Sequence, residues 1–191
     1  MRQPFLPQLL KGWLPVDAYF KRFGLPHSPR LQAALSCTDS LTRHLETESH
    51  QTVRVRLEHQ APMLDDADES SLWDQQQRLP PQSMILARSV WLLLEDQARL
   101  YAHSQVAIDQ LSPAAKTAIE QGDEPLGSLF LAHEGKVERT DLELAEAHIP
   151  DLAARLGHES NQSYWCRRSL FRVNHEIRAR IYEIFLPLLL S

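Results

Sequence analysis

The segment IRARIYEIFLP, residues 177–187, carries one carboxylate on an otherwise apolar face. Because side chains alternate along a strand, Glu183 shares its face with Ile177, Ala179, Ile181 and Phe185. Burying an ionised carboxylate is costly unless the group is paired or hydrogen-bonded. Glu183 therefore needs a partner, either elsewhere in the protein or on a ligand.

A second segment, ILARSVWLLL at residues 85–94, raises the same question with the opposite charge. Alternation places Arg88 on a face with Leu86, Val90, Leu92 and Leu94. A guanidinium stays protonated in proteins, so a buried one must meet an anion. Two interpretations are open. The two charges pair in the core, or both line a cavity where Arg88 holds a ligand carboxylate and the glutamate acts on a proton.

Other positions give weaker indications. Arg167 and Arg168 are adjacent, so strand alternation sends one of them to each face of a sheet. The turn Pro125-Leu126-Gly127 could present a backbone N–H to a ligand oxygen, or could simply precede a helix.

Composition narrows the functional classes. The 191 residues have an ordinary globular composition, and we expect one domain over residues 1–191. A net charge of −5 argues against a nucleic-acid partner. The nine histidines show no HxxxH or HExxH spacing, and Cys37 and Cys166 are far apart, so we expect neither a metal nor a cofactor. The apolar runs are too short to span a bilayer, so we expect a cytoplasmic protein.

Local patterns predict an α+β fold with an antiparallel sheet of about six strands and helices mainly on one face. Helices are expected at 29–36 after Ser28, at 40–48 with Thr38 or Asp39 as the cap, at 112–122, and soon after Pro125. Strands are expected at 52–61, in a hairpin over 83–108 that turns near residues 95–98, and in a hairpin formed by 163–173 and 177–187. Residues 136–149 and 150–157 fit either strand or helix. The acidic connection at 62–80 is a solvated loop or a lid over a site.

Five stretches also occur in an order and spacing that resemble the bacterial chorismate–pyruvate lyase family. They are DSLTRHLE (39–46), ARSVWLLLEDQARLYA (87–102), EPLGSLF (124–130), WCRRSLFRV (165–173) and YEIFLP (182–187). Together they cover most of the chain from about residue 38 onward. The resemblance implies a six-stranded antiparallel sheet flanked by helices, with a buried ligand cavity.

The resemblance also assigns site residues. Arg88 matches the arginine that binds the carboxylate of the aromatic acid, Leu126 matches the leucine whose main chain contacts the ligand, and Glu183 matches the active-site glutamate. Leu41 stands where the family usually has a methionine of the pocket wall. On the return arm of the first hairpin the family tends to carry AGR followed by Thr. This chain has AHSQ there, which puts Ser104 in the place of the arginine.

By resemblance, the protein is a cofactor-independent lyase that eliminates pyruvate from chorismate, leaving 4-hydroxybenzoate for ubiquinone biosynthesis. Chorismate and the aromatic product are then its small-molecule partners, and a monomer is expected. Apolar surroundings would raise the pKa of Glu183 and suit the carboxyl group to acid–base chemistry. The alternative is a non-catalytic homologue that binds an aromatic acid, or a ligand-sensing module of the same fold. Such modules are normally joined to a DNA-binding domain, for which the residues before Asp39 are too few.

Overall fold

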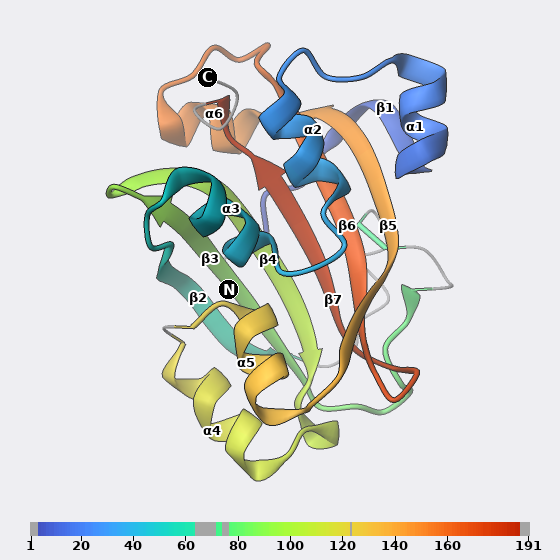
Figure 1. Cartoon of the computed structure of the whole chain (residues 1–191), viewed down its shortest axis with the longest axis vertical. Helices are drawn as coiled ribbons and strands as arrows, with labels where there is room; N and C mark the ends of the chain where they lie inside the picture. The colour runs from blue at the N-terminus through green and yellow to red at the C-terminus, as the bar shows by residue number, and fades with distance from the viewer. Residues whose placement is uncertain (1–3, 64–71, 74–76, 123, 188–191) are drawn as a thin grey trace.

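The computed structural model describes residues 4–63, 72–73, 77–122 and 124–187. Within these ranges, one antiparallel sheet has seven strands in the order β1-β5-β6-β7-β4-β3-β2 (Figure 1). The strands are β1 (Gln8–Pro15), β2 (Arg54–Met63), β3 (Ile85–Leu94), β4 (Gln97–Ala107), β5 (Val137–His148), β6 (Ser163–Val173) and β7 (Glu176–Phe185). The helices are α1 (Val16–Phe23), α2 (Pro29–Ser36), α3 (Leu41–Ser49), α4 (Pro113–Gln121), α5 (Leu126–His133) and α6 (Pro150–Leu156), with a short 3₁₀ helix η3 (Ile108–Gln110). The predicted α+β class is confirmed.

The strand count exceeds the expected six because the N-terminal segment adds β1 at one edge of the sheet, beside β5. Prolines and a lysine interrupt the apolar pattern of this segment, so its sequence does not resemble a strand. An edge strand tolerates such residues, because only one side of its backbone needs a hydrogen-bonded neighbour. The register of β1 against β5 is correspondingly irregular.

Both predicted hairpins form. The β3–β4 turn is made by Glu95 and Asp96, with φ angles of 49° and 63°. The β6–β7 turn is made by Asn174 and His175, with φ angles of 51° and 68°. Two successive left-handed residues give the turn whose twist matches antiparallel strands. The first hairpin is buried along all of β3, as expected for a strand that is covered on both faces.

Serine hydroxyls cap three helices. Ser28 and Ser112 accept hydrogen bonds from the third residue of α2 and of α4, as their sequences predict. For α3, however, the expected cap at Thr38 or Asp39 is wrong. Ser40 has extended backbone and its Oγ accepts from the N–H of Arg43 at 3.3 Å, so the helix begins one residue later than an Asp39 cap would place it.

The two ambiguous segments resolve into a strand, β5, and a helix, α6. Helices α1 to α5 cover one face of the sheet, which we call the helical face; it bears Val90, Phe171 and Phe185. Helix α6 packs on the opposite face against an aromatic cluster that includes Trp91 and Tyr182. Most helices therefore lie on one face, as predicted (Figure 1).

Much of the 62–80 connection lies outside the described residues, namely 64–71 and 74–76. Its first two residues belong to β2. The described residues Leu72 and Trp73 are buried with Tyr182 and Cys166, on the face of the sheet opposite the helical face. Leu72 and Trp73 are therefore not part of a solvated loop, and they do not form a lid over a site on the helical face. Within the described ranges, no helix has the length and apolar character needed to cross a membrane.

Candidate functional site

Arg88 and Glu183 lie on the helical face, one row apart across three adjacent strands. Arg88 stands opposite Ser104 on β4, and Ser104 stands opposite Ile181 on β7. The next row places Glu183 beside Ala102 of β4. The hairpin pairing therefore brings the two charged side chains to the same region of the sheet.

The two charges do not pair with each other, so the interpretation as a simple core ion pair is wrong. Glu183 binds two other arginines: Arg167 Nε donates to Glu183 Oε2 at 2.7 Å, and Arg139 Nη1 lies 3.2 Å from Oε2 and 3.4 Å from Oε1. All three side chains are buried, with exposed fractions of 5%, 0% and 7% for Glu183, Arg167 and Arg139. The carboxylate therefore sits between two cations in the interior.

Arg167 is held on two sides. Besides binding Glu183, its Nη1 donates to the carbonyl oxygens of Ala34 at 2.7 Å and Cys37 at 3.2 Å, at the end of α2. Its neighbour Arg168 points to the opposite face and binds Glu143 at 2.6 Å. Alternation thus sends one arginine to each face, as predicted.

Arg139 reaches the site because β5 is irregular. Thr140 faces Leu170 and Glu143 faces Arg168, so β5 carries one more residue than β6 between these pairs. The extra residue is a β-bulge in which Asp141 takes a left-handed φ of 52°. Because the bulge breaks the alternation, the sequence pattern of β5 gave no face for Arg139. The arginine lies over the ring of Phe171, 4.8 Å from its centroid.

The surroundings of Glu183 also correct the expected direction of its pKa. Burial is the largest single influence and favours the neutral carboxyl group, but the charges and hydrogen bonds of Arg167 and Arg139 together outweigh it. The pKa of Glu183 is therefore lowered rather than raised, and the group is a carboxylate at neutral pH. The sequence-based expectation failed because it counted the apolar neighbours on β7 and missed two arginines on other strands.

The guanidinium of Arg88 donates hydrogen bonds to main-chain carbonyl groups. Its Nη2 donates to the carbonyl oxygens of Gly122 and Glu124, each at 2.8 Å. Both carbonyls belong to the connection between α4 and α5, so Arg88 fixes the loop that leads into Leu126, the first residue of α5. Pro125 at the N-cap offers no side-chain acceptor to the first backbone N–H groups of α5. The helix start therefore keeps donors available to an anion next to Arg88.

A small cavity of about 50 Å³ is lined by both charged residues. Leu41 of α3, Leu126 of α5 and Ser104 of β4 also contribute to its wall, so all the residues predicted from the sequence meet here. The complete lining is Ser40, Leu41, Thr42, Arg88, Val90, Leu92, Ala102, Ser104, Pro125, Leu126, Gly127, Arg139, Phe171, Ile181 and Glu183. The volume holds a few water molecules but is smaller than the roughly 150 Å³ cavity that accommodates benzene in another protein.

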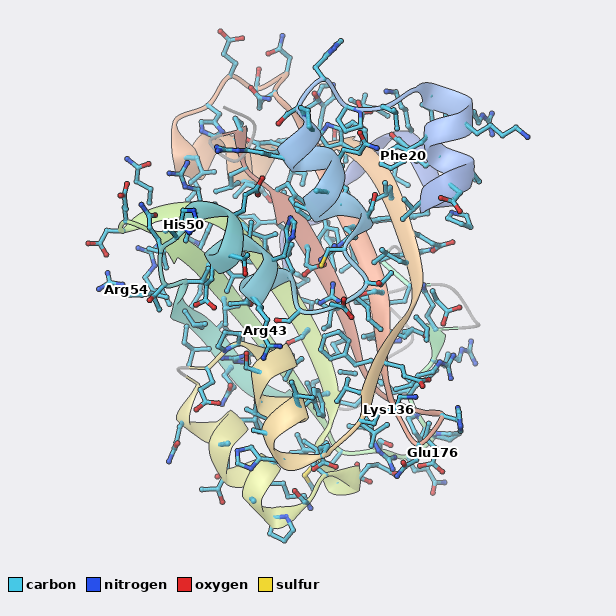
Figure 2. The ribbon with its side chains drawn as sticks, in the orientation of Figure 1. Phe20, Arg43, His50, Arg54, Lys136 and Glu176 are labelled. Atoms are coloured by element: carbon cyan, nitrogen blue, oxygen red, sulfur yellow. The ribbon has the colours of Figure 1, made fainter. Side chains whose placement is uncertain are left out.

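An open groove of about 550 Å³ adjoins the cavity and shares four of its lining residues, Ser40, Gly127, Arg139 and Phe171. The groove lies between α3 and α5, with α3 above α5 in the view of Figure 1. Arg43 of α3 lies at this gap, as Figure 2 shows. The shared residues lie where the groove meets the cavity.

The chain matches known proteins over most of its length. The family model described as "Chorismate pyruvate-lyase Rv2949c-like" matches residues 35–191. The chain belongs to this family. Two proteins named "Probable chorismate pyruvate-lyase" are among its relatives. The protein from Psychromonas ingrahamii is 26% identical over 153 residues, 78% of each chain. The protein from a Shewanella species is 28% identical over 169 residues, 85% of this chain and 83% of the relative.

Solved structures share the fold of this chorismate pyruvate-lyase family member at low sequence identity. PhnF from Mycobacterium smegmatis aligns with a TM-score of 0.59 and 9% identity, over 82% of this chain and 67% of PhnF. A GntR-family transcriptional regulator from Bacillus cereus aligns with a TM-score of 0.54 and 10% identity, over 71% and 92% of the respective chains. At such identities the likeness concerns the fold alone.

The described residues contain no group of three His, Cys, Asp or Glu side chains that could hold a metal ion. The polar groups of the cavity are instead two arginines, one carboxylate, hydroxyl groups and the start of α5. Such a set suits a small organic anion with a hydroxyl group. The charged residue of the cavity wall that the sequence pattern missed is Arg139.

Proposed function

We propose that this protein is a chorismate–pyruvate lyase that converts chorismate into 4-hydroxybenzoate and pyruvate. Membership of the family supports the reaction. The observation that carries the proposal is the small cavity that Arg88, the N-terminus of α5 and the ionised Glu183 line together. A cytoplasmic monomer that supplies 4-hydroxybenzoate for ubiquinone biosynthesis is part of the same proposal.

The proposed binding mode follows from the shape of the ligand. In 4-hydroxybenzoate the carboxylate and the hydroxyl group occupy opposite ends of the ring. Arg88 and the backbone N–H of Leu126 would bind the carboxylate, because a guanidinium and a helix start both favour an anion. The hydroxyl group would then donate to Glu183. Leu41, with Val90 on β3, would contact the apolar ring between the two ends.

The proposed chemistry is an elimination. Glu183 takes the proton from C4 of chorismate while the electrons of the C4–H bond form a ring double bond and the C3–O bond breaks. Enolpyruvate leaves, takes up a proton and becomes pyruvate, while the ring becomes aromatic. An ionised Glu183 suits the role of base or hydrogen-bond acceptor, and this argues against the same group donating a proton to the leaving ether oxygen.

Binding requires the cavity to enlarge, because about 50 Å³ cannot hold an aromatic ring. The groove between α3 and α5 indicates where this happens, since Ser40, Gly127, Arg139 and Phe171 line both spaces. In the proposal these helices move apart to admit the substrate. A site that closes in this way would release its product slowly.

The test is to incubate the purified protein with chorismate and to quantify 4-hydroxybenzoate and pyruvate by chromatography. Equal amounts of both products are expected. Arg88→Lys should weaken binding of 4-hydroxybenzoate about tenfold or more, because an ammonium group cannot form a two-point contact with a carboxylate. Arg30→Lys is the matched control, since Arg30 is an exposed residue of α2. Absence of both products with active-site binding intact would reject the lyase.

A second candidate is a non-enzymatic module that binds an aromatic acid. The fold it shares with a GntR-family transcriptional regulator is compatible with this alternative. The same incubation separates the two candidates. A binding module would bind 4-hydroxybenzoate with measurable heat and leave chorismate unchanged, whereas a lyase would consume it.

A further inference from the structure

Two of the described side chains that line the cavity are cationic, and they lie at different places. Arg88 lies beside the start of α5, whereas Arg139 lies beside Glu183. Arg139 also lines the open groove. The proposed function uses Arg88 for the carboxylate on the ring and leaves Arg139 without a role in binding.

The hydrogen bonds from Arg139 to Glu183 are long. Its contacts with Glu183 measure 3.2 and 3.4 Å, whereas Arg167 binds the same carboxylate at 2.7 Å. The Nε of Arg139 is buried and has no hydrogen-bond acceptor among the described residues. With an exposed fraction of 7%, this side chain is a buried cation, and not all of its N–H donors have an acceptor among the described residues.

Burial lowers the pKa of Arg139 to about 10, and Glu183 counteracts part of that effect. The guanidinium therefore stays protonated at neutral pH, and a second anion beside it would stabilise its charge further. Arg167 also has a buried donor, Nη2, without an acceptor among the described residues, but it lines neither the cavity nor the groove and is held by Glu183 and by two carbonyl oxygens at the end of α2. Of the two arginines at Glu183, Arg139 is the one able to move to a ligand.

Chorismate has a second carboxylate, on the enolpyruvyl group attached at C3. C3 is next to C4, whose hydroxyl group the proposed function places at Glu183. The enolpyruvyl group therefore projects from the Glu183 end of the cavity, where Arg139 borders the groove. We propose that Arg139 binds the enolpyruvyl carboxylate of the substrate, an inference that rests on the proposed function.

This contact would make Glu183 a better base at the moment it is needed. When Arg139 turns to the substrate, the buried carboxylate keeps only Arg167 as a cationic partner, and its pKa rises towards that of a more basic group. Once enolpyruvate has left, Arg139 can return to Glu183. The product 4-hydroxybenzoate lacks the second carboxylate and would leave Arg139 where it now is.

The experiment compares a dicarboxylate with a monocarboxylate ligand. For the Arg139→Gln variant, KM for chorismate should rise about tenfold or more, because a charge-assisted contact is lost. The Kd of 4-hydroxybenzoate, measured by calorimetry, should change less than about threefold, because the product makes no such contact. Arg139→Lys should recover part of the chorismate affinity. The control is Lys136→Gln, which removes an exposed cation just before β5 (Figure 2).

The outcomes distinguish the two proposals. Equal losses for both ligands would mean that Arg139 only supports Glu183, and unchanged values for both would mean that it contacts neither; each result overturns the inference. If the wild-type protein forms no product, the lyase assignment fails instead. Calorimetry with chorismate itself then decides about Arg139, since selective loss of chorismate binding in Arg139→Gln would still support the contact. Failure of the wild-type protein to bind either ligand would overturn both proposals.

Discussion

Arg167 and Glu183 face each other on the adjacent strands β6 and β7, with Arg167 Nε 2.7 Å from Glu183 Oε2. The same arginine donates to the carbonyl oxygens of Ala34 and Cys37. One side chain therefore joins the carboxylate at the end of the cavity to the end of α2. The ionised state of the proposed base and the packing of a helix on the sheet depend on the same residue.

The first prediction concerns this connection. Arg167→Met should lower the free energy of unfolding by about 3 kcal/mol or more, because it removes one partner of a fully buried ion pair and leaves two carbonyl groups without their donor. Urea denaturation monitored by circular dichroism measures the change. Arg172→Met on the same strand is the control. Loss of its partly exposed ion pair with Asp141 should lower the free energy of unfolding by about 1 kcal/mol or less. Equal effects of the two substitutions would contradict the structural role of Arg167.

The second prediction concerns pH. The pKa of Glu183 is lowered in the folded protein, whereas an unfolded glutamate has a pKa of about 4.3. Its ionisation therefore adds stability above the unfolded pKa, and that stability is lost as the pH falls through the folded pKa.

Comparison of the wild-type protein with Glu183→Gln isolates this contribution. The difference between their free energies of unfolding should be constant from about pH 5.5 to 7.5 and should shrink below about pH 4. Denaturant titrations at a series of pH values provide the measurement. A difference that grows on acidification would mean that the folded pKa is raised, and the proposed base would then be protonated at rest.

Much of the sheet could be predicted because its central strands follow simple patterns. The alternation correctly grouped Arg88 with Val90 and Glu183 with Phe185 on one face. The adjacency of Arg167 and Arg168 correctly sent one to each face. Serine followed by proline marked the starts of α2 and α4. These signals are local, so they do not depend on which distant segment packs against them.

The electrostatics of the site could not be predicted in this way. The pKa of Glu183 depends on Arg139, whose position requires the bulge at Asp141 and the pairing of β5 with β6. A bulge adds one residue to a strand and reverses every later side chain, so no fixed period in the sequence reports it. Two partners of Arg88 are main-chain carbonyls of a distant loop, which side-chain patterns also cannot indicate.

A third prediction uses the two thiols. Burial raises the pKa of Cys166 to about 12, and its side chain is completely inaccessible. Cys37 is partly exposed and lines the groove between α3 and α5. Iodoacetamide at pH 8 should therefore label Cys37 in the native protein and Cys166 only after unfolding, as mass spectrometry of the digested protein can show.

Ligand binding should slow the labelling of Cys37 several-fold if substrate enters through the groove. The control is a Cys37→Ser variant, which should take up no label while folded. Rapid native labelling of Cys166 would contradict its burial. Labelling of Cys37 at an unchanged rate in saturating 4-hydroxybenzoate would argue against the groove as the entrance.

The last prediction concerns Gly127 at the boundary between the groove and the cavity. A Cβ atom built there lies 3.8 Å from the ring of Phe171 and 4.0 Å from Ser40 Oγ, which is ordinary contact without a clash. The Gly127→Ala variant should therefore fold. Its free energy of unfolding should rise by up to about 1 kcal/mol, because alanine has a better helix propensity than glycine. The added methyl group narrows the passage, so the association rate of 4-hydroxybenzoate should fall about tenfold with little change in stability. Stopped-flow fluorescence measures this rate. Gly12→Ala on β1 is the control because its Cβ meets nothing within 4 Å. An association rate equal to that of the wild-type protein would place the entrance elsewhere.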